Sequence, residues 1–340
     1  MSIEDPLRIV AIGGGTGLST LLRGLKDYAH SPHYEAGKRL WPPVDVTAVV
    51  TVTDDGGSSG RLRRDFDVLP PGDIRNCMVA LSEDEALLSK LFQFRFDAGR
   101  GLKGHRFGNL FLTALTAVTG DFPQAVKFSA EVLAIAGRIY PSTGSNVSLE
   151  ARLADGTLVA GETRISRSKS RIERVYLNPR RRRPLKETLE AIAAADLICL
   201  GPGSLYTSVV PNLLVAGIPK AIQESAAAKA YFVNLMWQPG ETIGYSASDH
   251  VRAIHQHARR RLLDYAVINT HPITAALRRR YAAAKVYPVE NDTPRLRENG
   301  VEVVGADLLA RSEMVRHDHE AIAAVAIRLA GQGRRRTRSC

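Results

Sequence analysis

Four glycines in five positions, 13–17, lie between two apolar stretches, and this arrangement could bind an anion. Residues 7–12 are predicted to form a buried strand and residues 18–28 a helix. Backbone N–H groups of such a loop can point at phosphate oxygens, helped by the helix N-terminus. The dinucleotide fingerprint G-x-G-x-x-G is incomplete, because Leu18 takes the place of its third glycine. A tight turn without a ligand is the alternative. The predicted ligand-binding residues here are Gly13, Gly14, Gly15, Thr16 and Gly17.

A second loop follows the β-branched run 44–53 and reads TDDGGSSGR. Two adjacent carboxylates can hold Mg²⁺, while glycines and serines can surround a phosphate. An Asx turn followed by a helix N-cap would explain one aspartate and one serine, but not the whole string. We expect this loop and the glycine loop to form the two sides of a phosphate site. The predicted residues are Asp54 and Asp55, for ligand or metal, and Gly56, Gly57, Ser58 and Ser59.

Weaker signals come from three other polar clusters, each of which could be plain turn or capping chemistry. GPGS follows the apolar run 196–200, and its predicted ligand-binding residues are Gly201, Gly203 and Ser204. DIRN and KGHRFGN open apolar helices, and the second of them forms an anion-facing corner in our interpretation. The residues predicted from these two clusters are Asn76, Lys103, His105 and Asn109.

The elements that must position these loops alternate between strand and helix. Further strands are expected at 196–200, 231–236, 265–270 and 286–289, with helices between them and a closing helix over 319–330. This alternation predicts a Rossmann-like, doubly wound α/β fold, with a mostly parallel sheet and helices on both faces. Ligands then bind beyond the carboxyl ends of the strands.

We expect one domain over residues 1–330. It would include a helical segment at about 73–137 and a small antiparallel β extension at about 139–177. The proline-containing insert 30–43 is predicted to be a loop, and 331–340 a basic, disordered tail.

The formal charge of +11 is concentrated in four arginine runs, at 180–183, 259–261, 278–280 and 334–338. Removing their 14 arginines would leave a charge of −3. We interpret the runs as solvated helix faces, with a nucleic-acid patch as the alternative, and do not expect nucleic acid as a partner.

Cysteine usage and hydropathy favour a cytoplasmic protein. The three cysteines are widely spaced, without a metal-binding or disulfide pattern. No stretch approaches the roughly 20 apolar residues of a membrane span. The first residues lack the apolar run of a signal peptide.

These loops, in this order, resemble the CofD/YvcK family, whose YvcK branch comprises the gluconeogenesis factors. The strings that carry the resemblance include IGGGTGLSTLLRGLK, VTDDGGSSGRLR, PGDIRNCMVALS, LKGHRFGNLFLTAL, LADGTLVAGE, ICLGPGSLYTSVVPNLLV, NLMWQPGET, SDHV and VRHD. The resemblance covers most of the chain. Trp237 departs from it, because a threonine is expected in that loop.

The resemblance implies a phosphorylated ligand at the carboxyl edge of the sheet. One branch resembles 2-phospho-L-lactate transferase, a Mg²⁺-dependent enzyme. The other comprises YvcK-like regulators of gluconeogenic growth and cell shape, thought to bind nucleotide sugars such as UDP-N-acetylglucosamine without established catalysis. By this resemblance, Leu205, Tyr206, Asn234, Tyr281 and Arg316 also belong to the ligand site.

The strings around GPGSLYTS and NLMWQPGET favour the regulator branch, so we expect a nucleotide-sugar-binding, non-catalytic protein. The alternative is a Mg²⁺-dependent phospholactyl transferase, with Asp54 and Asp55 as its catalytic residues. NAD could occupy the same loops by shape. The sequence leaves the oligomeric state open, a homo-oligomer included.

Overall fold

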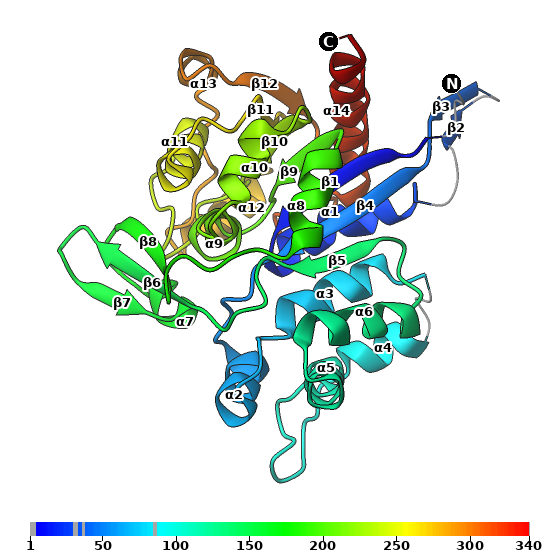
Figure 1. Ribbon diagram of the computed structural model, residues 1–340. Helices are drawn as coiled ribbons and strands as arrows, with labels where there is room; N and C mark the ends of the chain where they lie inside the picture. The colour runs from blue at the N-terminus through cyan, green and yellow to red at the C-terminus, as the bar shows by residue number, and fades with distance from the viewer. Residues whose placement is uncertain (1–4, 30–32, 36–37, 84–86, 340) are drawn as a thin grey trace.

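The computed structural model describes residues 5–29, 33–35, 38–83 and 87–339, and its centre is a sheet of seven parallel strands (Figure 1). In spatial order these are β12 (Glu302–Ala306), β11 (Tyr265–Asn269), β10 (Ala228–Phe232), β9 (Leu197–Leu200), β1 (Leu7–Gly13), β4 (Val44–Val50) and β5 (Arg138–Pro141). β1 is apolar along most of its length because both faces of a parallel sheet are covered. Its Ala11 pairs with Ala48 of β4 and Cys199 of β9, and all three are buried.

The order of the strands reverses direction at β1. The chain leaves β1 through α1 (Gly15–Lys26) and returns as β4 on one side, whereas β9 pairs with the other side. The carboxyl ends of β1 and β9 therefore meet at the topological switch point, where open α/β sheets bind their ligands.

Helices cover both faces of the sheet, which confirms the predicted Rossmann-like, doubly wound architecture. On one face α1 packs against α3 (Gly72–Leu81) and α14 (His319–Ser339). The helices on the other face are α8 (Lys186–Ala194), α9 (Val210–Leu213), α10 (Ile218–Glu224) and α11 (Ala247–Ala258) (Figure 1).

The predicted helical region 73–137 contains α3 and three more helices beside the sheet, α4 (Leu87–Gln93), α5 (Phe107–Thr119) and α6 (Phe122–Val132). α6 begins where predicted, because the Asp121 carboxylate accepts a hydrogen bond from the Gln124 amide at 3.1 Å. α5 packs against α4 through the ring of Phe92, which meets that of Phe111 at 5.1 Å.

A small antiparallel sheet lies beside the main sheet, but it is shorter than predicted. Its strands are β6 (Ser148–Leu153), β7 (Leu158–Ala160) and β8 (Ile172–Asn178), with the short helix α7 (Glu162–Ile165) between β7 and β8. The start of the predicted extension, Ile139, belongs to β5 and pairs in parallel with Ala48 of β4.

Two further predictions were wrong. Residues 286–289 form no strand; Pro288 makes only an isolated bridge to Met236, and the edge strand is β12 instead. The sequence pattern did not predict β12, because an edge strand lacks the continuous burial of the central strands. The insert 30–43 contains a hairpin of β2 (His33–Glu35) and β3 (Lys38–Trp41) rather than only loop; its residues 30–32 and 36–37 lie outside the described part.

The basic end of the chain is helical rather than disordered up to Ser339; residue 340 is not described. Contacts of Arg334 hold the end of α14 against the rest of the chain. Its guanidinium pairs with the Asp196 carboxylate at 2.5 Å and donates to the Asp5 carbonyl at 2.7 Å, and both side chains of the pair are largely buried. Gly333 allows this approach, because a Cβ there would lie 2.1 Å from the Asp196 carbonyl oxygen.

Within the described ranges, no single helix is long and apolar enough to span a membrane. A bent pair, Leu205–Leu213 with Ile218–Glu224, passes the same criteria of length and composition, but apolar residues of both segments are buried in the core.

Candidate functional site

The glycine loop after β1 lies directly against the GPGS loop after β9. A Cβ at Gly17 would lie 2.4 Å from the Pro202 carbonyl oxygen and 2.8 Å from the Gly203 Cα. Only glycine permits two backbones to approach so closely. The pair of loops is therefore a two-sided structure at the switch point. The TDDGGSSGR loop follows β4 on the other side of β1, where its Asp54 lies near Asp73.

The N-terminus of α1 is open toward a cavity between these loops. Gly14 is its N-cap residue, with no side-chain cap, and the first turn contains no acidic residue. The cavity has a volume of about 270 Å³, and residues 14–17, Gly203, Ser204 and Asn234 line it. Unpaired amides and the helix dipole favour an anion at such a position.

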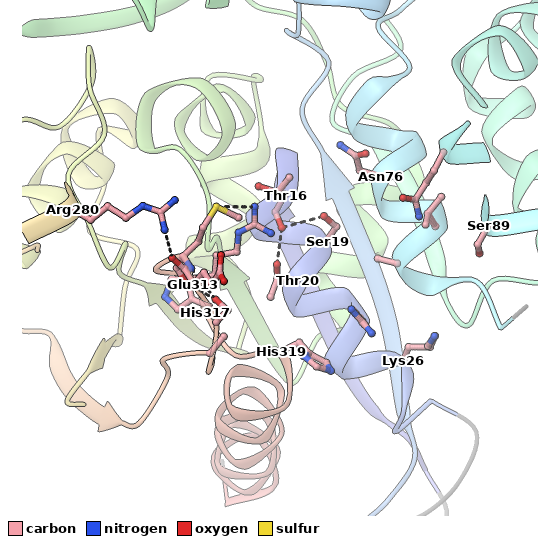
Figure 2. A pocket seen from close by; sticks show the side chains of 18 residues that line it. Thr16, Ser19, Thr20, Lys26, Asn76, Ser89, Arg280, Glu313, His317 and His319 are labelled. Atoms are coloured by element: carbon pink, nitrogen blue, oxygen red, sulfur yellow. Dashed lines mark hydrogen bonds between the residues drawn. The ribbon is translucent and has the colours of Figure 1, made fainter. Parts of the chain in front are cut away.

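A larger cavity of about 780 Å³ adjoins the first, with which it shares Thr16, Thr20, Arg316 and His317. It runs along α1 between α3 and the loop 310–318 (Figure 2). Its Lys and Arg lining residues are Arg23, Lys26, Arg280 and Arg316, and among the described lining residues Glu313 is the one carboxylate. We call the two cavities together the switch-point cleft.

Buried contacts fix the loop that carries Arg316. The Val315 amide donates to the Tyr281 hydroxyl at 3.2 Å, and the His317 Nε2 donates to the Val233 carbonyl at 3.2 Å. Burial lowers the pKa of His317 to about 4, so its ring is neutral at physiological pH. Tyr281 lines neither cavity and packs beneath the loop, where its hydroxyl accepts from the amide next to Arg316.

Protein side chains already occupy the backbone amides that follow the GPGS loop. Residues 205–209 form a π-helix (Leu205–Val209), and the Glu241 carboxylate accepts from the Tyr206 amide and the Thr207 hydroxyl, each at 3.0 Å. Gln238 accepts from the Leu205 amide at 3.3 Å. The side chains of Leu205 and Tyr206 are buried in the core, so these two residues support the cleft and do not line it.

The two adjacent aspartates point to different partners. The Asp54 Oδ1 atom accepts from the Gly56 amide at 2.8 Å, whereas Asp55 Oδ1 accepts from the amide and hydroxyl of Thr163 at 2.9 and 2.7 Å. Asp55 thereby fastens α7 to the main sheet. In the part of the chain that is described, no three His, Cys, Asp or Glu side chains form a metal-ligand group.

Asp73 is a buried carboxyl directly beneath the glycine loop. It accepts a hydrogen bond from the Gly15 amide, and a Cβ at Gly14 would lie 2.6 Å from its Oδ2 atom. Burial, and secondly the charge of Asp54, raise the pKa of Asp73 to about 7. Burial and the neighbouring carboxylates also raise the pKa of Glu162. A group of buried carboxyls, two of them shifted toward the neutral form, thus lies below the loop whose amides face the cleft.

Several other predicted residues meet in a buried hydrogen-bond chain around Arg75. Its guanidinium donates to the Asn109 side chain at 2.9 Å and to the Asn76 side chain at 2.5 Å. Asn109 then donates to the Ser58 hydroxyl at 3.1 Å, which lies 3.0 Å from the His105 Nδ1 atom. Burial and the charge of Arg61 lower the pKa of His105. Of this chain, only Asn76 lines the cleft.

The described structure therefore divides the predicted site residues into two sets. Those lining the cleft are Gly14, Gly15, Thr16, Gly17, Asn76, Gly203, Ser204, Asn234 and Arg316. Those outside its lining are Gly13, Asp54, Asp55, Gly56, Gly57, Ser58, Ser59, Lys103, His105, Asn109, Gly201, Leu205, Tyr206 and Tyr281. Lys103 is exposed; its carbonyl accepts from Arg61 at 2.8 Å and its amide donates to the Gly99 carbonyl at 3.1 Å.

Sequence reasoning missed Thr20, Arg23 and Gln238, which also line the cleft. A signal for the first two exists, because residues 16, 20 and 23 recur at helical spacing on one face of α1. No local pattern marks Gln238, whose Nε2 atom donates to the Ser204 hydroxyl at 2.8 Å.

Asp73→Asn keeps the size of the side chain but removes its titration. The pKa of Asp73 is about 7 in the folded chain against an ordinary 3.8, so the neutral form favours folding. That contribution is complete below pH of about 4 and is lost as the pH rises to about 7. We expect the unfolding free energy of the wild type to fall relative to Asp73→Asn across this window, by at most about 4 kcal/mol.

Urea unfolding of both proteins from about pH 4 to about pH 8 measures the difference. Asp65→Asn, at an exposed position of α2 (Gly57–Phe66), is the matched control and should follow the wild-type profile. Parallel profiles for wild type and Asp73→Asn would contradict the raised pKa.

Comparison with known proteins gives the family. Residues 9–309 match the model of 2-phospho-L-lactate transferase CofD. The chain is 46% identical to the gluconeogenesis factor of Halalkalibacterium halodurans over 91% of this chain and 92% of that protein. It is 44% identical to the gluconeogenesis factor of Bacillus subtilis, over 95% of this chain and 98% of that protein. A crystal structure of a Bacillus halodurans protein, 44% identical, superposes with a TM-score of 0.88 over 96% of this chain and 99% of that one. The chain therefore belongs to the CofD family, on the branch of the gluconeogenesis factors.

Proposed function

We propose that the protein binds a nucleotide sugar of the UDP-N-acetylglucosamine class in the switch-point cleft and acts as a regulator. The observation that carries the proposal is the open N-terminus of α1, whose amides face a cleft with four Lys or Arg lining residues and one carboxylate in the described chain. A diphosphate matches these amides and Arg316. The cavity of about 780 Å³ offers room for the base and sugar, since ligand pockets typically measure roughly 300–1,000 Å³.

Binding without turnover is the simpler assignment for this lining. Among the described lining residues there is no cysteine, and Glu313 is the one acid. Burial lowers the pKa of His317 to about 4, so its ring is too weakly basic to be an effective general base near neutral pH. The names of the relatives support a role in growth on gluconeogenic carbon sources, with ligand binding as the signal. A link to cell shape is part of the same proposal.

Calorimetric titration with UDP-N-acetylglucosamine tests this function. The wild type should bind it, and Arg316→Ala should bind about 10- to 100-fold more weakly, because a charge-assisted hydrogen bond to phosphate is lost. Gly17→Ala should abolish binding, because the added Cβ forces the two loops apart. Gly144→Ala is the control: a Cβ there meets only ordinary contacts, the nearest at 3.6 Å.

Thermal unfolding must show that each variant is folded before its affinity is compared. Titrations with NAD and with AMP separate a nucleotide-sugar site from a dinucleotide site. Absence of binding to UDP-N-acetylglucosamine at millimolar concentration, with NAD bound instead, would overturn the proposed ligand.

A Mg²⁺-dependent phospholactyl transferase is the second candidate, and the buried carboxyls below the glycine loop favour it. Asp54 lies close enough to Asp73 to raise its pKa, and the Glu162 Oε2 atom is buried without a hydrogen-bond partner. A cation would relieve this repulsion. Asp54 and Asp73 would hold it, rather than Asp54 and Asp55, because Asp55 is engaged by Thr163. Bound Mg²⁺ would neutralise charge on phosphate oxygens.

Asp54→Asn tests this candidate. If the protein is a transferase, product formation from a phospholactyl donor and a deazaflavin acceptor should require Mg²⁺ and fall by at least about 100-fold in the variant. Asp65→Asn is again the control. A wild type that forms no product with Mg²⁺ present, while still binding UDP-N-acetylglucosamine, rules out this substrate pair and leaves the regulator.

A further inference from the structure

A second cavity, remote from the switch-point cleft, collects two of the four arginine runs. It lies between β8, the residues after it, α9 and α10, and the end of α11, and has a volume of about 480 Å³. It shares no lining residue with the cleft. Segments about 80 residues apart in sequence thus bring the runs 180–183 and 259–261 to the same hollow. We call it the arginine cavity.

The arginine cavity is strongly cationic and has no acidic lining residue. Its cations are Arg174, Arg180, Arg181, Lys220, Arg259 and Arg260. In the described chain, Lys220 alone among them has an ion pair, with Glu224 at 3.6 Å, and that pair is exposed. Two of the others contact neutral groups: Arg174 donates to the Gln256 carbonyl at 3.4 Å, and Arg260 to the Gln223 side chain. Converging cations without counter-charges favour a bound polyanion.

Two of these arginines adopt a backbone conformation that favours glycine. Arg181 has φ of 59° and Arg259 φ of 54°; the described chain has three other non-glycine residues with positive φ. Arg259 follows the end of α11, at a helix C-terminus where glycine is the usual residue. Arginine has a backbone cost there that glycine lacks, although its charge suits a helix C-terminus.

The floor of the cavity is apolar. Val175, Leu177, Leu213 and Val215 line it and are buried. A cavity lined by both apolar residues and several cations suits a ligand with a compact, highly charged group and an uncharged organic part. Its volume lies within the range of roughly 300–1,000 Å³ of small-molecule sites.

A nucleic acid fits less well. Single-strand sites combine a basic groove with aromatic rings open to stacking. Of the two lining residues with aromatic rings, Tyr176 has the Arg180 guanidinium over its ring at 4.5 Å, and His257 is buried with its ring against Tyr206. The cations also surround one hollow instead of following a track.

We propose that the arginine cavity is a second ligand site, for a small organic polyphosphate of the nucleoside triphosphate class. Its ligand would bind independently of the ligand of the switch-point cleft, so the protein could respond to two different small molecules. The proposal does not depend on the function assigned to the cleft.

The test uses the full chain carrying Arg316→Ala, so that ATP bound in the switch-point cleft contributes little. ATP should bind this protein with one site. Adding Arg181→Gly and Arg259→Gly removes two cations, while glycine keeps the backbone conformation at both positions. This should weaken ATP binding by at least about tenfold, with thermal stability unchanged or raised.

A matched control removes two cations elsewhere. Arg261→Ala with Lys285→Gly takes one charge beside the cavity and one from another positive-φ position, Lys285 with φ of 56°, and neither residue lines the cavity. ATP affinity should then change less than about twofold, as expected for distant screened charges. AMP and inorganic tripolyphosphate should each bind more weakly than ATP, because AMP lacks the polyphosphate and tripolyphosphate lacks the uncharged organic part.

Three results would overturn the proposal. The first is no ATP binding in the Arg316→Ala protein. The second is an equal loss in the control pair, which would reduce the effect to net charge. The third is tighter binding of a single-stranded RNA than of ATP, lost in the Arg181→Gly and Arg259→Gly protein, which would assign the cavity to nucleic acid.

Discussion

The contact on which this structure depends is the approach of two backbones at the switch point, Gly17 against Pro202 and Gly203. β1 and β9 are neighbours in the sheet but separated by about 190 residues in sequence, so this contact closes the whole α/β core. A side chain at Gly17 would separate the loops, widen the cleft and remove the edge against which α1 presents its amides. A dinucleotide fingerprint would place its third glycine at position 18, which is Leu18 here. In this chain the close backbone approach is made one residue earlier, by Gly17, and its partner is the GPGS loop instead of a strand.

Hydrogen-bond donors and cations lie on one side of this contact, and carboxyls lie on the other. Amides and arginines face the cleft, whereas carboxyls lie behind the loops: Asp73 beneath the glycine loop and Glu241 at the start of the π-helix. Each carboxyl fixes backbone amides that would otherwise lack partners, and burial raises the pKa of both. The Gly15 amide is held by Asp73, which leaves the next amides of α1 for a ligand. The same arrangement serves a sensor or a transferase, and the difference between them rests on whether a cation joins Asp54 and Asp73.

Much of the fold followed from local pattern, whereas the site followed only in part. Glycine loops, buried strands such as 7–12 and the helix start at Asp121 are local, so periodicity and capping predicted them. The predictions that failed depended on contacts between distant parts of the sequence. β12 is an edge strand. Arg334 pairs with the distant Asp196, and Asp55 accepts a hydrogen bond from the distant Thr163. The GPGS loop gives a weaker sequence signal than TDDGGSSGR, because nothing local shows that β9 pairs with β1. The arginine runs also divide by tertiary context: Arg280 lines the cleft, Arg334 is an ion-pair partner, and the other two runs meet in one cavity.

The most direct test of the central claim is a crystal structure of the wild-type protein with UDP-N-acetylglucosamine. We predict the diphosphate within hydrogen-bond distance of the Thr16 and Gly17 amides and the Arg316 guanidinium, with the loops still in contact at Gly17 and Pro202. A nucleotide sugar bound elsewhere, or a diphosphate held by the residues of the TDDGGSSGR loop with the α1 amides free, would contradict the account.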